Sequence, residues 1–130
     1  GLSNVTVDQL ATVVESARIL PAVVQVESHP YRPRTRLLET CHDLGIRVMA
    51  HSPLSAPGLL DEPVLDDIAD THGISPAQVV IAWHRARGVV PLPASNDPDH
   101  IVENLAAGGR RLADSERSRI DALEDPEFER

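Results

Sequence analysis

Short β-branched segments alternate with helical patterns along this chain of 130 residues, and the alternation constrains the fold more than any other feature. Residues 22–27, 46–50 and 89–93 are rich in β-branched and other apolar residues, as expected of strands buried on both faces of a sheet. The opening residues 1–4, GLSN, fit the tail of a further strand. Strands that alternate with helices at short spacing form right-handed βαβ units, so the sequence predicts a parallel sheet.

Capping and stop signals predict where the helices begin and end. Thr6 and Gln9 have the spacing of a capping box, and the apolar residues after them recur every three or four positions, which predicts a helix over about 7–18. A second helical stripe over 33–44 stops at Gly45. Further helices are predicted around 65–72, 76–87, 101–105 and 114–123.

The number of βα units indicates half of a barrel. Four units are visible, whereas a complete eight-unit barrel takes about 250 residues. We therefore expect an α/β fold that forms half of a TIM (β/α)8 barrel, as a single domain over residues 1–130 with one hydrophobic core. An open sheet of this kind has two unpaired edges and an uncovered face, so we expect the barrel to be completed by dimerisation or by a complementary half-barrel chain.

Composition excludes several classes of partner and chemistry. The formal net charge of −8 and the pI near 5.1 argue against nucleic acid and anionic membranes, and favour a small-molecule or protein partner. The chain contains no lysine, which excludes a lysine Schiff base. Cys41 is the single cysteine and is expected to be buried, so no internal disulfide can form. Without a signal peptide or an apolar run of about 20 residues, we expect a cytoplasmic protein.

Polar residues follow the predicted strands, where parallel α/β folds bind their ligands. Asn4 and Gln25 could together clamp a primary carboxamide, because each amide offers an acceptor and two donors. The alternative is that they tie down loops. The full set at the strand ends is Ser3, Asn4, Gln25, Glu27, His29, His51, Ser52, Ala94 and Ser95.

Two further kinds of chemistry concern the same strand ends. His51 and Glu27, with His29 nearby, could act as an acid/base pair if they share a pocket, or could form a structural hydrogen-bonded pair. No metal site is expected, because the histidines lack the close spacing to Cys or carboxylates that zinc sites show. The irregular loop 52–63 is a candidate lid or cofactor loop, and Arg34 and Arg36 are expected to be solvated surface.

Five ordered blocks carry a resemblance to a known family. They are GLSN at 1–4, VVQVESHPY at 23–31, CHDLGIRVMAHSPL at 41–54, HGISPAQVVIAWHRARGVVPLPAS at 72–95 and IVEN at 101–104. In this order and at these separations they resemble the C-terminal half of the aldo-keto reductase family. The resemblance implies a (β/α)8 barrel that transfers hydride from NADPH to aldehydes and ketones.

The same resemblance implies a set of cofactor-binding residues. Ser3, Asn4 and Gln25 would hold the carboxamide, and His51 would replace the aromatic residue that stacks on the nicotinamide. The remaining positions would follow the rest of the cofactor: Ser52 and Leu54 along the pyrophosphate, Ser95 and Asn96 near the adenosine 2′-phosphate, and Glu103 and Asn104 by the adenine.

The sequence departs from the family pattern where the 2′-phosphate binds. Ala94 stands in place of a lysine and His100 in place of an arginine. Each lost charge-assisted contact is worth roughly 1.5–3 kcal/mol, so NADPH binding is expected to weaken by roughly a hundredfold or more. The resemblance also places the family's catalytic Asp, Tyr, Lys and His in the first half of the barrel, and Tyr31 does not stand at the place of the catalytic tyrosine.

Three functions follow as alternatives. The first is the cofactor-binding half of an NAD(P)H-dependent oxidoreductase that is not a competent reductase alone. The second is a homodimeric half-barrel enzyme, an isomerase, cyclase or dehydratase, that uses His51, Glu27 and His29. The third is a non-catalytic interaction protein.

Overall fold

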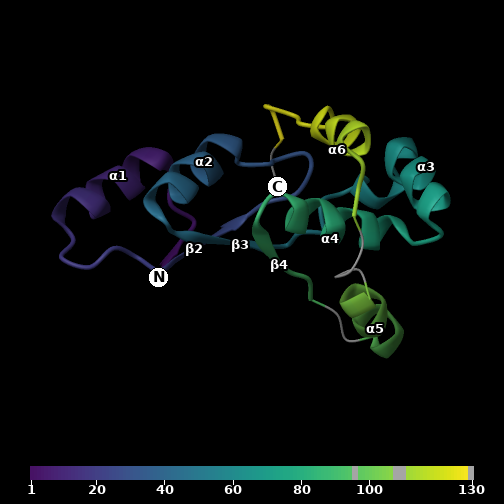
Figure 1. Cartoon of the computed structure of the whole chain (residues 1–130), viewed down its shortest axis with the longest axis horizontal. Coiled ribbons are helices and arrows are strands. Elements are labelled where there is room, and N and C mark those ends of the chain that lie inside the picture. The colour runs from purple at the N-terminus through teal and green to yellow at the C-terminus, as the bar shows by residue number, and fades with distance from the viewer. Residues whose placement is uncertain (95–96, 107–110, 129–130) are drawn as a thin grey trace.

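The computed structural model describes residues 1–94, 97–106 and 111–128. Eleven elements follow in the order β1 (Leu2–Ser3), α1 (Val7–Ser16), β2 (Val23–Glu27), α2 (Thr35–Leu44), β3 (Arg47–His51), η1 (Leu59–Asp61), α3 (Pro63–His72), α4 (Pro76–Ala86), β4 (Val89–Leu92), α5 (Pro98–Ala106) and α6 (Asp114–Asp121). Figure 1 shows α1 and α2 beside the first strands, and α3, α4 and α6 on the far side of β4. Across these three stretches of the chain, no helix is both long and apolar enough to cross a membrane.

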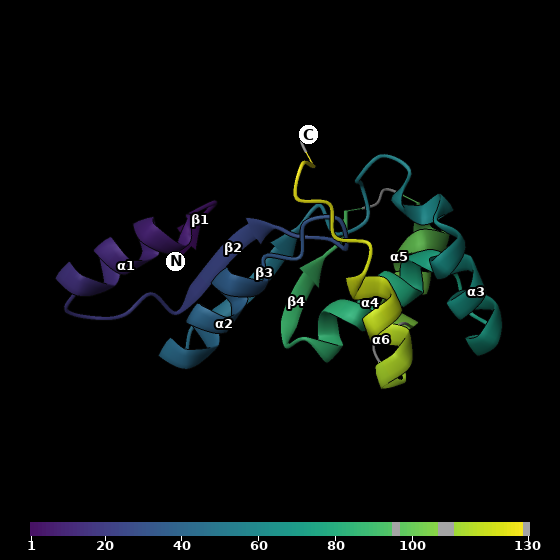
Figure 2. The same ribbon diagram turned by 90° about the horizontal axis from the view of Figure 1, so that it is seen from above.

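The four strands form one parallel sheet in the order β1-β2-β3-β4, which confirms the predicted α/β fold. Figure 2 shows the arrows of β2, β3 and β4 running side by side in the same direction. Val24 pairs with Val48 and Glu27 with His51, so the polar ends of β2 and β3 lie next to each other. The residues 1–4 do end a short strand, as predicted, and β1 pairs with β2.

Helix α1 begins as predicted but ends earlier. The Thr6 hydroxyl accepts the Gln9 N–H at 3.1 Å and the Gln9 side chain accepts the Thr6 N–H at 2.9 Å, which completes the capping box. The helix stops at Ser16, two residues before the predicted end, and Ala17 is already extended. The Ser16 hydroxyl donates back to the carbonyl of Thr12, a local bond that competes with the helical ladder.

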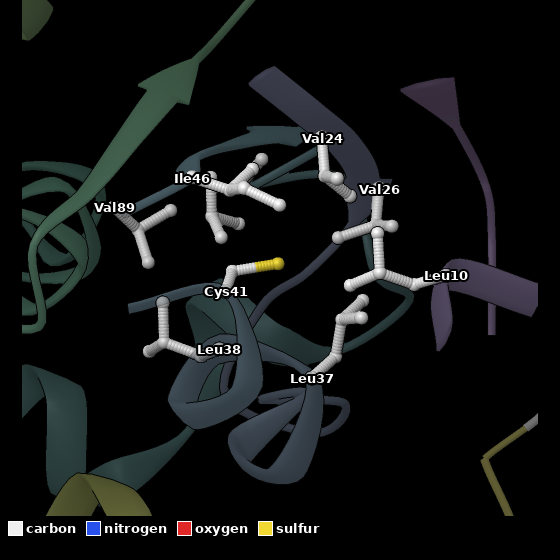
Figure 3. Packing of buried hydrophobic residues seen from close by; sticks show 10 residues of the cluster. Leu10, Val24, Val26, Leu37, Leu38, Cys41, Ile46 and Val89 are labelled. Carbon is white, nitrogen blue, oxygen red and sulfur yellow. The ribbon is translucent and has the colours of Figure 1, made fainter. Parts of the chain in front are cut away.

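The first cluster of buried side chains lies between the sheet and helices α1 and α2. Leu37, Leu38 and Cys41 project from α2 toward the strands, as Figure 3 shows. The residues that meet them are Val24, Val26, Val48, Ala50 and Val89 of the strands, Ile46 just before β3, and Leu10 from α1. Cys41 is fully buried, as predicted, and burial raises the pKa of its thiol.

A second cluster, separate from the first, corrects the expectation of one core. It is formed by α3, α4, the loop before them and α6, and its buried members are Ala56, Leu59, Leu65, Ile68, Ala69, Val79, Val80, Trp83 and Ile120. Trp83 is fully buried and donates its indole N–H to the Asp121 carboxylate at 2.9 Å. This bond attaches α6 to α4, and the Arg87 guanidinium lies 4.4 Å from the centre of the Trp83 ring.

The loop between β3 and α3 is held in place along part of its length. Leu59, in η1, is fully buried in the second cluster. The Tyr31 hydroxyl donates to Glu62 Oε1 at 2.6 Å, which attaches the end of the loop to the segment after β2. Pro53 is also buried and Leu54 packs against the same cluster, so the loop is anchored at both its ends and the predicted lid has no support from this geometry.

The titration of Tyr31 tests this attachment. Burial, followed by the hydrogen bond to Glu62, raises the pKa of Tyr31 to about 12. The chain has a single tyrosine, so its absorbance near 295 nm reports this residue alone. We expect a midpoint displaced from about 10 toward 12, and Glu62→Gln to move it part of the way back because burial remains. A midpoint near 10 in a chain that circular dichroism shows to be folded would contradict the attachment.

His84 makes stability depend on pH. It is fully buried on α4, and burial, with smaller effects of Arg87 and His29, lowers its pKa to about 3. The unfolded chain therefore binds a proton near pH 6.5 that the folded chain does not, and stability falls as pH drops below about 6.5. From pH 7.5 to 5.5 this group alone removes about 1.4 kcal/mol of unfolding free energy.

Urea unfolding at the two pH values measures this loss. We expect His84→Gln to show a smaller fall in unfolding free energy than the parent chain, by about 1.4 kcal/mol. His100→Gln is the matched control, because His100 is exposed and should leave the fall unchanged. Equal falls in His84→Gln and the parent would show that His84 is not held neutral.

Candidate functional site

The carboxyl ends of β1, β2 and β3 bring the predicted carboxamide ligands together. Ser3 pairs with Gln25 across the sheet, and the Asn4 N–H donates to the Gln25 carbonyl at 2.8 Å. Successive residues of a strand point to opposite faces. Because Val24 and Val26 are buried under the helices, Gln25 lies on the opposite face, where it is partly exposed.

His51 connects the ends of β1 and β3. Its Nε2 lies 3.0 Å from Asn4 Oδ1, and its Nδ1 lies 3.2 Å from the Ser52 hydroxyl. An amide oxygen can only accept, so Nε2 carries a hydrogen and donates it. In the neutral ring Nδ1 then accepts the Ser52 hydroxyl. The two bonds hold the imidazole in place, one of them to Asn4, 47 residues away in the sequence.

The backbone at these strand ends is conformationally unusual. Asn4 has φ of 55° and Ser52 has φ of 52°, both in the left-handed region that residues other than glycine seldom adopt. Such conformations persist where surrounding contacts hold them, and they concentrate at ligand-binding sites. Both residues are hydrogen-bonded to the same histidine, so the bonds of His51 contribute to holding the two turns.

The hydrogen-bonding groups of Ser3, Asn4 and Gln25 suit a primary carboxamide. Asn4 Oδ1 is taken by His51, which leaves its two N–H donors, and Ser3 adds a hydroxyl that can donate or accept. Gln25 adds an acceptor and two further donors. A carboxamide needs donors facing its carbonyl oxygen and acceptors facing its NH2 group, and this set supplies both kinds, so these residues fit the nicotinamide end of a cofactor.

Glu27 and His29 form a buried pair. His29 Nε2 lies 3.0 Å from Glu27 Oε1. The exposed fraction is 0% for His29 and 8% for Glu27. Glu27 is next to His51 in the strand register, as expected, but its carboxylate is bonded to His29. The rings of Tyr31 and Phe128 pack against His29, with centroids at 6.1 and 4.7 Å. Glu27 is thus paired with His29, whereas the hydrogen bonds described for His51 go to Asn4 and Ser52.

The residues predicted for the far end of the cofactor are only partly described. Ser95 and Asn96 lie outside the described residues. Glu103 and Asn104 are half-buried on α5, which packs against α4, and the Glu103 carbonyl accepts the Gln78 side chain at 2.9 Å. Ala94 is exposed, and Leu54 packs against the second cluster. His100 is exposed near the start of α5, and its Nε2 lies 4.0 Å from Asp97 Oδ2.

Some features of the site could not be read from the sequence. The Tyr31–Glu62 bond joins residues 31 positions apart and has no local signal. Arg34, expected to be solvated, is half-buried, and its Nε donates to the Glu27 carbonyl at 3.0 Å. The positive φ of Arg34, 58°, is likewise not signalled by the residue type.

Comparison with known proteins identifies the family. The model of the aldo/keto reductase family matches residues 1–125. The chain is 38% identical over 133 residues to aldo-keto reductase family 1 member A1 of Mus musculus, covering 95% of the chain and 41% of that protein. It is also 38% identical over 138 residues to the probable NAD(P)H-dependent D-xylose reductase xyl1 of Emericella nidulans, covering 95% of the chain and 43% of that protein. The chain therefore spans about two fifths of the length of these relatives.

Solved structures agree with this assignment. MGS-M4, an aldo-keto reductase from a Medee basin deep-sea metagenome library, has a TM-score of 0.94 at 29% identity, over 98% of this chain and 48% of its own. Gox0644 has a TM-score of 0.92 at 30% identity, over 98% of this chain and 47% of its own. A variant of Gox0644 was solved in complex with NADPH and has a TM-score of 0.89. These neighbours are TIM barrels of which the chain covers about half, and the chain belongs to the aldo/keto reductase family.

Proposed function

We propose that this chain forms the nicotinamide-binding part of an NAD(P)H-dependent carbonyl reductase. The observation that carries the proposal is the bonded set of Asn4, His51 and Ser52 beside Gln25, at the carboxyl ends of neighbouring parallel strands. The relatives support it, because one is called NAD(P)H-dependent and a structural neighbour was solved with NADPH. When bound, the cofactor would supply a hydride to the carbonyl carbon of the substrate.

The chain's own residues would bind and orient that cofactor. Ser3, Asn4 and Gln25 would hold the carboxamide, which fixes the rotation of the nicotinamide ring. His51 replaces the family's stacking aromatic residue, and its two hydrogen bonds hold its ring in one orientation. The other contacts follow from the family positions of Ser52, Leu54, Ser95, Asn96, Glu103 and Asn104.

Turnover requires groups that these 130 residues do not supply. The family's catalytic Asp, Tyr, Lys and His belong to the first half of the barrel, and this sequence contains no lysine. A complementary half-barrel, whether part of a longer polypeptide or a separate chain, would pair with β1 and β4, the two edges of the described sheet. A second copy of this chain could close the same edges but would bring no lysine.

The acid/base alternative receives no support from the geometry. Proton transfer to a substrate needs an acid and a base that reach it, whereas Glu27 and His29 are buried and bonded to each other. A non-catalytic role likewise has no particular observation in its favour. We therefore propose cofactor binding as the function of the strand ends.

A titration of the purified chain with NADPH and NADH, followed by cofactor fluorescence at low and moderate salt, tests the proposal. We expect saturable binding of both cofactors, weakened about tenfold or more by Gln25→Leu, which removes the hydrogen bonds of one amide to the carboxamide. Arg85→Gln, an exposed change on α4, is the control. No binding of either cofactor up to millimolar concentration would overturn the proposal.

The double variant Ala94→Lys with His100→Arg tests how the 2′-phosphate is recognised. We expect it to tighten NADPH binding by roughly a hundredfold, since two charge-assisted contacts are restored. NADH lacks the 2′-phosphate, so its dissociation constant should change by less than about twofold and serves as the internal control. Equal gains for both cofactors, or none, would show that these positions do not meet the 2′-phosphate.

A further inference from the structure

A cavity of about 620 Å³ lies apart from the cofactor-binding residues. It opens between the N-terminal ends of α1 and α2 and the C-terminal segment 124–128. This segment is held in place by a hydrogen bond from the Asp125 N–H to the Tyr31 carbonyl at 2.9 Å. Its walls come from three separate parts of the chain, so it is a product of the fold and not of one loop. None of the proposed cofactor-binding residues that the structure describes lines it.

Three arginines line this cavity. Arg32 and Arg34 are half-buried, and Arg36 is exposed. Within the part of the chain that the structure describes, neither Arg32 nor Arg36 forms an ion pair. Burial lowers the pKa of Arg34 and the Arg32 guanidinium lowers it further, whereas Glu27 opposes both effects. Two like charges are thus held near each other in a partly desolvated place, and an anion between them would relieve the repulsion.

The backbone beside the cavity also favours a negatively charged group. Arg34 is the N-cap of α2, and its side chain makes no capping hydrogen bond to the first turn. The N-terminus of a helix carries a partial positive charge and free N–H donors. The arginines and the helix end therefore favour the same kind of group.

The rest of the wall is apolar, and carboxylates limit the total charge. The Tyr31 and Phe128 rings stack at 5.8 Å with 28° between their planes, beside the buried Pro33 and Leu37. Glu39, Glu124 and Asp125 also line the cavity. The three acidic side chains offset the charge of the three arginines, so the net charge of the cavity wall is small. A ligand with one negative charge therefore suits the cavity better than a multiply charged one.

We propose that this cavity binds a small monoanionic organic acid, with its carboxylate between Arg32 and Arg34 and its apolar or aromatic part against Tyr31 and Phe128. A guanidinium presents two parallel N–H donors that match the two oxygens of a carboxylate. The apolar wall provides the contact area that a bare inorganic ion could not use. This binding is independent of the nicotinamide site.

Isotope-edited NMR titrations with benzoate test the proposal, with benzamide as the neutral isostere and inorganic phosphate as the charge without an apolar part. We expect benzoate to shift the amide signals of residues 31–39 saturably and to bind at least about tenfold more tightly than either comparison ligand. Arg32→Gln should weaken benzoate about tenfold or more, as should Phe128→Ala, whereas Arg85→Gln on the exposed face of α4 should not.

Each other outcome overturns the proposal, provided that circular dichroism shows the variants to be folded. If benzamide bound as tightly as benzoate, the arginines would not recognise the carboxylate. If phosphate bound as tightly as benzoate, the aromatic wall would not contribute to binding. Displacement of benzoate by NADPH would place it at the strand ends. If neither cofactor binds while benzoate does, the cavity stands and the proposed cofactor function fails, so the two results are separable.

Discussion

The register between β2 and β3 is the constraint on which both the core and the site depend. Val24 pairs with Val48 and Glu27 with His51. Since side chains alternate between the faces of a strand, this register turns Val24 and Val48 toward α1 and α2, and leaves Gln25 and His51 on the other face. A slip of one residue would place polar side chains in the core and valines at the site, so the packing of the helices also fixes the position of the cofactor-binding groups.

Helices α1 and α2 cover one face of the sheet, and the opposite face carries the polar side chains at the strand ends. The first cluster fills the space under α1 and α2, whereas the second lies among α3, α4 and α6 and includes no sheet residue. The second cluster therefore stabilises the helices that follow β3, independently of the strands. It connects to the site through Leu54 and Tyr31, which pack against it, so the order of the loop after His51 depends on the packing of these helices.

Features that depend on neighbouring residues could be predicted from the sequence, and those that depend on distant ones could not. The Thr6–Gln9 capping box and the glycine stop at Gly45 are local, and both are present. The strand ends were predicted because polar residues follow apolar runs. The sequence predicts a pair of Glu27 with His51, either catalytic or structural, because the two residues end neighbouring strands. The observed partner of Glu27 is His29, since side-chain rotamers as well as strand register decide the pairing. The attachment of the C-terminal segment to Tyr31 requires the whole fold.

The N-termini of α5 and α2 carry different charges, and this difference distinguishes the proposed cofactor site from the proposed organic-acid cavity. At α5, where the family position for an arginine holds His100, the Asp97 carboxylate accepts the Asp99 N–H at 2.9 Å, and both acids oppose an incoming phosphate. At α2 the N-cap side chain makes no capping hydrogen bond, and the cavity beside the helix is lined by three arginines together with Glu39, Glu124 and Asp125. The start of α2 therefore places guanidinium groups beside a helix end, whereas the family position for an arginine at α5 holds an imidazole. The cofactor would then be held mainly by its nicotinamide end, where binding depends on the hydrogen bonds of Ser3, Asn4 and Gln25 and not on charge.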